Sequence, residues 1–367
     1  MRKIRVLIVD DSVVFRVLLS KLLGTDGGIE VTGRAENGQV ALKKIAHSVP
    51  DIVTLDVDMP VLDGLETLAE IRKLYPTLPV IMLSATTASG AADTLEALQR
   101  GASDYVVKPS ESNGGSARLI EELIPKINAL GRPPAPASET TRTAPVLRST
   151  GVHRRISIGK GSEVYAVALG VSTGGPNALA ALLPSLPSDL ATPVLVVQHM
   201  PPMFTRILAE RLNREAKAHV VEAHDGQRVE PGTVYIAPGD FHMEVCGSPG
   251  SAVLRMNRNP KEHSVRPAVD VLFRSVANVY GSNALGVVLT GMGKDGLAGC
   301  EVLAEKGCPI ITQDEATSVV WGMPGFVTQA GLATKTLPLS LIGPEISRRV
   351  GRNGAESTLA LRGRHSA

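Results

Sequence analysis

Short apolar runs alternate with amphipathic stretches over the first 125 residues. The apolar runs have the length of buried parallel strands, and the stretches between them have the spacing of helices that bury one face. The predicted strands are Ile4 to Val9, Ile29 to Arg34, Asp51 to Leu55, Pro79 to Leu83 and Asp104 to Val107. The predicted helices lie near Ser12 to Leu23, Gly38 to Ala46, Leu65 to Lys73 and Ala91 to Arg100. Strands that alternate with helices in this way predict an α/β domain with a doubly wound parallel sheet.

The same alternation resumes after residue 160. Strands are predicted at Val164 to Leu169, Pro193 to Gln198 and Ala284 to Leu289, each followed by a helical stretch. Between them, the segments near Thr233 to Ala237, Phe241 to Cys246 and Val253 to Met256 indicate an antiparallel insertion. The second half is therefore predicted to be another doubly wound, mostly parallel α/β domain that carries an antiparallel insertion.

The stretch from residue 131 to 145 is rich in Pro, Ser, Thr and Ala and cannot build a core. We therefore predict a first domain over residues 1–125, a linker over 126–160 and a second domain over 161–347. Residues 348–367 are expected to form a disordered tail.

The composition excludes several classes of protein. With 367 residues, the chain is long enough for two domains that each bury a core. The formal net charge is +2 and the sequence has no run of basic residues interleaved with aromatic ones, which argues against a nucleic-acid partner. The three cysteines have neither disulfide-framework nor zinc-ligand spacing, and no apolar run approaches the roughly 18 residues of a membrane span. We expect an unexported protein of the reducing cytoplasm.

Polar residues follow the predicted strands of the first domain, where ligands bind in sheets of this kind. Asp10 and Asp11 follow the first strand, Asp56 the third, Ser84 the fourth and Lys108 the fifth. Three crowded carboxylates repel one another, and a divalent cation bound by oxygens relieves that repulsion, with Mg²⁺ the expected ion. A hydroxyl and a lysine beside them supply what a phosphoryl group on a carboxylate needs.

These residues give residues 1 to about 125 a resemblance to the receiver domain of two-component response regulators, which has a flavodoxin-like five-stranded sheet. The resemblance implies that Asp56 accepts a phosphoryl group from a histidine kinase. It also implies that Mg²⁺ is held by Asp10, Asp11, Asp56 and the backbone carbonyl of Asp58. Ser84 and Lys108 would then bind the phosphoryl oxygens, and Tyr105 has the position of the switch aromatic.

A second chemical signal is the run Gly-Val-Ser-Thr-Gly-Gly-Pro at residues 170–176, between a predicted strand and a predicted helix. In this context Gly-x-Ser-x-Gly can be a nucleophile elbow, which lifts the hydroxyl of Ser172 clear of the sheet edge beside helix N-terminal amides that can hold an oxyanion. Glycine-rich turns of this kind also bind phosphates, and a serine there can be a simple helix cap. The turn alone does not decide among these roles.

A base and an acid stand at equivalent places. His199 follows the predicted strand Pro193 to Gln198, and Asp295 lies in the glycine-rich turn after Ala284 to Leu289. Since parallel strands end on one edge of a sheet, that edge can bring Ser172, His199 and Asp295 together. A serine needs an imidazole to take its proton, and the imidazole needs a carboxylate. The chain order Ser, His, Asp differs from that of α/β-hydrolases.

Other residues compete for these roles. The alternative bases are His219, His224, His242 and His263, and the alternative acids are Asp225, Asp240 and Asp270. We expect His242 to be half-exposed on a strand, and His263 to lie on a loop where it could touch substrate. Asp270 is expected on a helix. Solvated or capping positions are the default for all three acids.

Four motifs of the second half resemble the chemotaxis protein-glutamate methylesterase and glutamine deamidase family: Ser172-Thr173-Gly174-Gly175, Gln198-His199-Met200-Pro201, Arg266-Pro267 with Val269 to Phe273, and Leu289 to Gly296. The whole chain matches that family in domain order. The resemblance implies that Ser172, His199 and Asp295 form the triad, with Thr173 and Met292 supporting the oxyanion site. One departure is that Ser264-Val265 separates His263 from Arg266, where the family's His and Arg adjoin.

The expected function is that of a phosphorylation-controlled serine hydrolase that demethylates, and in some cases deamidates, glutamate side chains of methyl-accepting chemoreceptors. The resemblance implies that the unphosphorylated receiver covers the active edge. Chemoreceptors and a histidine kinase are the expected partners, and no cofactor is expected in the hydrolase site. A non-enzymatic adaptor remains an alternative, and a transcription factor is disfavoured because the second half has no helix-turn-helix pattern.

Overall fold

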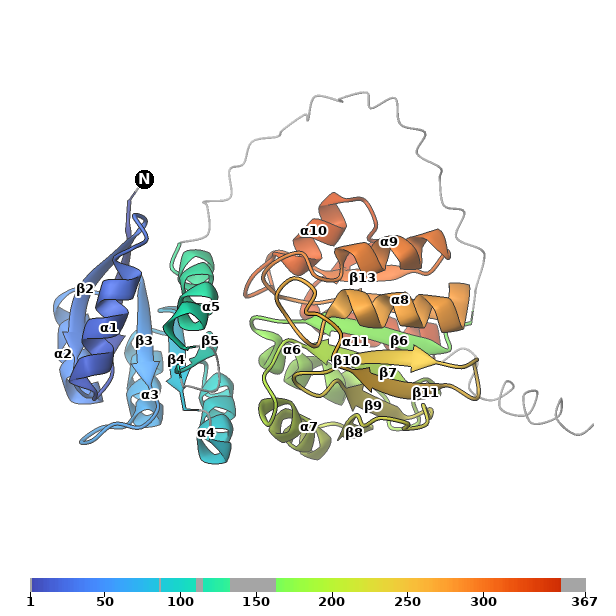
Figure 1. Ribbon diagram of the computed structural model, residues 1–367, viewed down its shortest axis with the longest axis horizontal. Coiled ribbons are helices and arrows are strands. Elements are labelled where there is room, and N and C mark those ends of the chain that lie inside the picture. Colours follow the sequence, from blue (N-terminus) through green and yellow to red (C-terminus); the bar gives the residue numbers. More distant parts are fainter. Residues whose placement is uncertain (1, 86, 110–114, 133–162, 351–367) are drawn as a thin grey trace, which may run out of the picture.

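The computed structural model describes residues 2–85, 87–109, 115–132 and 163–350, which form two α/β units side by side (Figure 1). Residues 133–160 of the predicted linker (126–160) and residues 351–367 of the predicted tail (348–367) lie outside the described residues. Helix α5 continues to Leu130, past the predicted boundary at residue 125, and helix α11 ends at Val350.

The first unit contains a five-stranded parallel sheet in the order β2-β1-β3-β4-β5. Its strands are β1 (Ile4–Val9), β2 (Ile29–Ala35), β3 (Ile52–Asp56), β4 (Val80–Ser84) and β5 (Asp104–Val107). Its helices are α1 (Val13–Leu23), α2 (Gly38–His47), α3 (Gly64–Leu74), α4 (Ala88–Gln99) and α5 (Gly115–Leu130). Strand order and direction confirm the predicted doubly wound sheet.

Local sequence starts several of these helices. Ser12 caps α1 by accepting a hydrogen bond from the amide of Phe15, and Asn37 does the same for α2. Asp63 and Glu66 form a reciprocal capping box at the start of α3. Because these caps fix where each helix begins, they also fix the loops that follow β1 and β3, in which the conspicuous carboxylates lie.

The second unit is built on a seven-stranded sheet in the order β14-β13-β12-β6-β7-β9-β8. Its strands are β6 (Ala166–Val171), β7 (Val194–Gln198), β8 (His219–Glu222), β9 (Thr233–Ile236), β12 (Ala284–Val288), β13 (Ile310–Gln313) and β14 (Lys335–Leu337). The helices are α6 (Gly175–Leu182), α7 (Phe204–Glu215), α8 (Val269–Tyr280), α9 (Leu297–Glu305), α10 (Met323–Gln329) and α11 (Leu339–Val350). All pairings within this sheet are parallel.

The antiparallel insertion is smaller than predicted. Among the strands of the described residues, only β10 (His242–Cys246) and β11 (Val253–Asn257) form an antiparallel ladder. The segment from Thr233 was wrongly placed in the insertion: as β9 it pairs in parallel with both β7 and β8. The turn that follows β9 suggested a hairpin, but the chain leaves the large sheet there.

Alternate side chains of β6 build two cores, one on each face of the sheet. Val167, Leu169 and Val171 pack with α6, α7 and α11, whereas Ala166 and Ala168 pack with α8, α9 and α10. Because helices cover both faces of the sheet, polar side chains of the strands can reach solvent only at the strand ends.

The two units are in direct contact through α4 of the first and through α6 and α7 of the second. Two backbone carbonyls near the end of α4 accept hydrogen bonds from the second unit: Leu98 from Asn177 Nδ2 at 2.8 Å, and Leu95 from the guanidinium of Arg211 at 3.0 Å. The rings of Tyr105 and Phe204 stack with centroids 5.0 Å apart. The contact is therefore both apolar and hydrogen-bonded.

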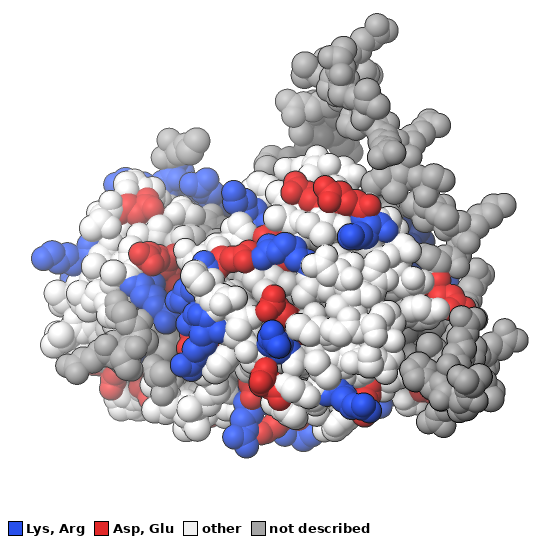
Figure 2. All heavy atoms as spheres, turned by 45° about the vertical axis from the view of Figure 1, so that its right-hand side comes forward, with Lys and Arg blue, Asp and Glu red and all other residues white. Residues whose placement is uncertain are grey.

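Positive and negative side chains are interspersed on the face shown in Figure 2, in keeping with the small net charge. Among the described residues, no helix has the length and apolar character that a membrane crossing requires.

Candidate functional site

The first candidate site is the pocket of carboxylates at the carboxyl ends of β1 and β3. The ammonium of Lys108 lies between two of them, 2.7 Å from Asp10 Oδ2 and 2.6 Å from Asp56 Oδ2. Asp10 and Asp56 are buried, whereas Asp11 is exposed. The ends of β1, β3 and β5 thus bring together Asp10, Asp56 and Lys108, three of the residues that the sequence selected.

Burial raises the pKa of Asp56 to about 6, although the hydrogen bond and charge of Lys108 oppose the rise. The negative charge of Asp10 adds to the effect of burial. A carboxylate that is costly to ionise gains from any cation placed beside it, so the pocket favours a bound positive charge.

The residues present fit a hard divalent cation. Ligand atoms of Asp10, Asp11 and Asp56 all lie within 4.8 Å of one another, and oxygen donors in that number suit Mg²⁺. Asp58 is exposed in the bend after β3, on the same side of the sheet. The positions of Asp10, Asp11 and Asp56 are thus compatible with the predicted Mg²⁺ site.

Ser84, at the carboxyl end of β4, and Tyr105, within β5, are both buried. The hydroxyl of Ser84 donates to the carbonyl of Gly90 at 3.0 Å and accepts from Thr94 at 2.6 Å, so it is engaged with α4. Tyr105 faces the second unit, where its ring stacks on Phe204. Ser84 is therefore hydrogen-bonded to α4, which contacts the second unit, and Tyr105 lies in the same contact between the units. Through these two residues the carboxylate site is connected to the contact between the two units.

The second candidate site is the rim at the carboxyl ends of β6, β7 and β12. Ser172 follows β6 directly and is partly exposed, and its amide donates to the carbonyl of Thr290 at 3.0 Å. Gly174 begins α6 with φ of +77°, and a Cβ there would lie 2.6 Å from Val319. Only glycine fits this turn, which presents the serine at the start of a helix.

The predicted base and acid are in contact. His199 Nε2 lies 2.8 Å from Asp295 Oδ2, and His199 follows β7 at the position next to Ser172, because Val171 and Gln198 are paired neighbours. A neutral imidazole that donates from Nε2 to the carboxylate has its Nδ1 lone pair free of that bond. Such a nitrogen can accept the proton of a hydroxyl.

Asp295 is held by backbone amides as well as by histidine. It accepts hydrogen bonds from Val269 at 2.7 Å and Asp270 at 2.9 Å, the first two residues of α8, and from Gly296 at 2.9 Å. Burial alone would raise its pKa, but His199 and these amides outweigh burial and lower it. Asp295 is therefore kept ionised in a fixed orientation.

The turn after β12 lies close to the serine. A Cβ on Gly291 would lie 2.9 Å from Ser172 Cβ and 2.4 Å from Met323 Sδ, so any larger residue there would displace the serine. Met292 follows and is half-buried. Thr173 is buried, and its carbonyl accepts the hydroxyl of Thr290 at 3.0 Å. The predicted oxyanion residues therefore flank the serine from two turns.

The rival histidines differ from expectation in one case. His242 is not half-exposed but buried, with 1% of its surface exposed, because it bridges the carbonyl of Pro260 and the amide of Ala268. His224 is exposed in a turn, and His219 begins β8 at the far edge of the sheet.

Among the rival acids, Asp225 and Asp240 lie in turns as expected. Asp240 pairs with Arg266, with Nη2 and Oδ1 2.6 Å apart. Asp270 lies on α8 as expected but is not solvated. Its exposure is 1%, and it accepts the amide of Gly299 at 2.6 Å and binds His263 at 2.8 Å.

Sequence reasoning missed Gln198 as a link between the turns that carry Ser172 and His199. Its buried side-chain amide donates to the carbonyl of Ser172 at 3.1 Å and to that of His199 at 3.2 Å. The only signal was its place at a strand end beside His199, where the apolar pattern breaks.

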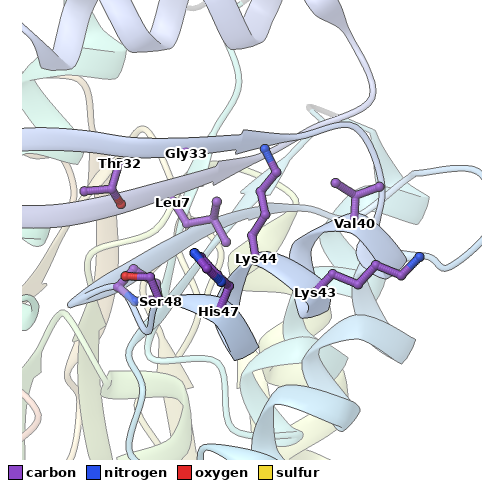
Figure 3. Close-up of a pocket in the computed structure, with 9 residues that line it drawn as sticks. Leu7, Thr32, Gly33, Val40, Lys43, Lys44, His47 and Ser48 are labelled. Atoms are coloured by element: carbon purple, nitrogen blue, oxygen red, sulfur yellow. The ribbon is translucent and has the colours of Figure 1, made fainter.

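A pocket of about 380 Å³ lies in the first unit between β2 and α2, lined in part by Lys43, Lys44 and His47 (Figure 3). The ammonium of Lys44 already donates to the carbonyl of Arg34 at 2.7 Å. None of the lining residues belongs to either candidate site, and the pocket is open to solvent, so the chemistry is placed at the two rims.

Comparison with known proteins agrees with this geometry. A family model described as CheB methylesterase matches residues 167–346, and one described as response regulator receiver domain matches residues 6–119. A protein-glutamate methylesterase/protein-glutamine glutaminase of Nocardioides sp. is 50% identical over 363 residues, which cover 95% of this chain and 96% of that protein.

The chain belongs to the protein-glutamate methylesterase/protein-glutamine glutaminase family. A second member, from Trichodesmium erythraeum, is 47% identical and matches over 96% of this chain and 100% of its own. The crystal structure of the Thermotoga maritima CheB methylesterase catalytic domain is 42% identical, with a TM-score of 0.50, and covers 51% of this chain and 98% of that domain.

Membership of this methylesterase family makes the chain a hydrolase with a response regulator receiver, as predicted, and the adaptor alternative is set aside. The receiver match is to a domain type whose members bind Mg²⁺ at the phosphorylation site, and the carboxylate pocket described above has suitable donors.

Proposed function

We propose that this chain is a phosphorylation-activated serine hydrolase of the cytoplasm that demethylates glutamate γ-methyl esters, and deamidates particular glutamines, on methyl-accepting chemoreceptors. The observation that carries the proposal is the contact of His199 with a buried, ionised Asp295 directly beside Ser172 on one rim of the sheet. Nucleophile, base and orienting acid are thereby present in one place.

The reaction follows from these positions. Ser172 Oγ attacks the ester or amide carbonyl while His199 takes the hydroxyl proton, and amides at the start of α6, with Thr173 and Met292 alongside, stabilise the oxyanion. The imidazolium then gives its proton to departing methanol or ammonia. Water hydrolyses the acyl-enzyme by the same steps in reverse order, which leaves a glutamate carboxylate and the free serine. Asp295 remains ionised throughout.

Regulation follows from the contact of the two units. Asp56 would accept a phosphoryl group from a histidine kinase, with Mg²⁺ held by Asp10, Asp11, Asp56 and the Asp58 carbonyl to neutralise the phosphoryl charge. Ser84 and Lys108 would bind the phosphoryl oxygens. The helices that the receiver contacts, α6 and α7, begin at the turns that carry Ser172 and His199, so separation of the units would uncover that rim.

The test is methanol release from methylated chemoreceptors in membranes, with and without acetyl phosphate and Mg²⁺. We expect slow release that acetyl phosphate accelerates, and none from Ser172→Ala. The variant should melt like the parent, because Ser172 contributes only its backbone to the turn bonds described. Turnover retained by Ser172→Ala would eliminate the nucleophile assignment, and an unchanged rate with phosphodonor would eliminate the switch.

A further inference from the structure

A second histidine and a second carboxylate lie directly behind the proposed triad. His263 Nε2 lies 2.8 Å from Asp270 Oδ2, the same separation as that between His199 and Asp295. Ligand atoms of His263, Asp270 and Asp295 all lie within 4.8 Å of one another. The site therefore contains two histidine–carboxylate pairs whose carboxylates are neighbours.

Each of the two carboxylates accepts hydrogen bonds from amides in the first turn of the helix next to the other carboxylate. Asp295, which precedes α9, accepts the first two amides of α8, and Asp270 in the first turn of α8 accepts the amide of Gly299 in the first turn of α9. Neither carboxylate can move away from the other without breaking these bonds. Two fixed, buried negative charges repel each other, and this repulsion must be offset for both to remain ionised.

The interactions that offset this repulsion differ between Asp270 and Asp295. Burial, reinforced by the charge of Asp295, raises the pKa of Asp270, while the bonds from Gly299 and His263 oppose the rise. The pKa of Asp295 is shifted the opposite way: burial would raise it, but the hydrogen bond and charge of His199 and the amides of Asp270 and Val269 lower it. His263 is thus the side chain that, together with the Gly299 amide, favours the ionised form of the second carboxylate.

The backbone that presents His263 is built for that contact. His263 and Ser264 both have positive φ, at 50° and 64°, a conformation that residues other than glycine seldom adopt. Glu262 beside them pairs with Arg274 on α8 at 2.5 Å, and Arg266 donates to the carbonyl of Asn259 at 2.9 Å. The loop is anchored on both sides of the histidine.

We propose that His263 is a positioning residue for the hydrolase reaction, which acts through Asp270 to balance the negative charge next to Asp295 and so sets the proton affinity of His199. This inference rests on the proposed function of Ser172, His199 and Asp295. Among the described residues near Asp270, Arg274 lies one helical turn further along α8 and pairs with Glu262. The buried thiol of Cys300 on α9 also feels the charge of Asp270, and burial raises the pKa of this thiol well above its usual value.

Removal of His263 would leave the charge of Asp270 without its partner. An uncompensated negative charge stabilises the protonated form of His199, which cannot accept the serine proton, so activity should be lost at a higher pH on the acid side. Removal of the Asp270 charge should have the opposite effect. If His263 acts only through Asp270, its removal should change nothing once that charge is gone.

The experiment measures kcat/KM for methanol release by the full chain, activated with acetyl phosphate, from pH 5 to 9. His263→Ala should lower the plateau about tenfold and move the acid limb up by about half a pH unit. His263→Gln, which keeps a hydrogen-bond donor but no charge, should keep more of the plateau yet show the same shift. Asp270→Asn should move the acid limb down, and adding His263→Ala to it should have no further effect.

The controls separate this inference from the function on which it rests. His224→Ala removes an exposed histidine whose ring nitrogen Nδ1 lies 3.1 Å from the carbonyl oxygen of the adjacent Asp225, and its profile should match the parent. Loss of turnover in Ser172→Ala supports the serine mechanism independently of His263. With that loss established, an unshifted acid limb in both His263 variants, or an equal effect of His263→Ala with and without Asp270→Asn, would overturn the proposal.

Discussion

Arg211 should hold the hydrolase unit closed when the receiver is unphosphorylated. Its side chain is only 9% exposed, and its guanidinium donates to the carbonyl of Leu95 in α4 while Nε pairs with Glu215 at 3.0 Å. A hydrogen bond from a charged donor contributes about 1.5–3 kcal/mol. Arg211→Ala should therefore raise the population of separated units, and with it the basal rate, by roughly tenfold to a hundredfold, up to the fully activated rate.

The chain offers a matched control on the same helix. Arg206 makes the same type of pair with Glu210 at 3.0 Å, but its side chain is 72% exposed, so Arg206→Ala should leave the basal rate unchanged. Asn177→Ala removes one neutral hydrogen bond to Leu98 and should raise the basal rate by about two- to tenfold. The assay is methanol release without phosphodonor, beside the acetyl phosphate-activated rate of each variant. A basal rate for folded Arg211→Ala equal to that of the parent would show that Arg211 does not hold the two units together.

Three further predictions concern single groups. Asp295→Asn should lower kcat by roughly 10³- to 10⁴-fold in stopped assays, since an amide cannot hold His199 in the required tautomer. It should also lower Tm in thermal melts, because the NH₂ group of the new side chain must face backbone amides. Lys108→Met should raise the pKa of Asp56 above its value of about 6, because the lysine opposes the effect of burial; carboxyl NMR titration without Mg²⁺ would show no change if the account is wrong. Gly291→Ala should reduce turnover with little change in KM, because the added methyl would press on the serine Cβ at 2.9 Å.

The pH dependence of stability follows from the direction of the Asp56 shift. The pKa of this carboxyl is higher in the folded chain than the ordinary value of 3.8, so the folded state favours the protonated form. Ionisation of Asp56 therefore reduces stability as pH rises from about 4 towards 6, and the reduction is complete above about 6. A cation in the pocket should reverse this loss.

Much of this architecture could be predicted from sequence because its chemistry lies at strand ends. An apolar run followed at once by Asp56, Ser172 or His199 identifies both the strand and the rim on which the side chain stands. The contact of His199 with Asp295 also followed, since parallel strands β6, β7 and β12 are neighbours.

What could not be predicted depends on long-range placement. β9 has the same local pattern as a hairpin strand, and only its pairing with β7 and β8 decides its role. His242 alternates with apolar residues as an exposed strand residue would, but the packing of α8 buries it. Asp270 resembles an ordinary helix-start carboxylate, and nothing in its neighbours reveals that α9 and His263 meet it.

Arg211 illustrates the same limit between units. On α7 its sequence surroundings are those of any exposed arginine with a glutamate four residues on, and Arg206 has the same pattern. Only the docking of α4 distinguishes the two, and such contacts have no periodic signature in the chain.

The proposed reaction requires that one serine hydroxyl carries the acyl group. The most direct measurement is to treat the acetyl phosphate-activated chain with a fluorophosphonate probe and to locate the adduct by peptide mass spectrometry. The account predicts a single adduct on Ser172, lost in His199→Ala because the proton acceptor is gone. An adduct on another residue, or labelling of Ser172 that is unchanged without His199, would contradict it.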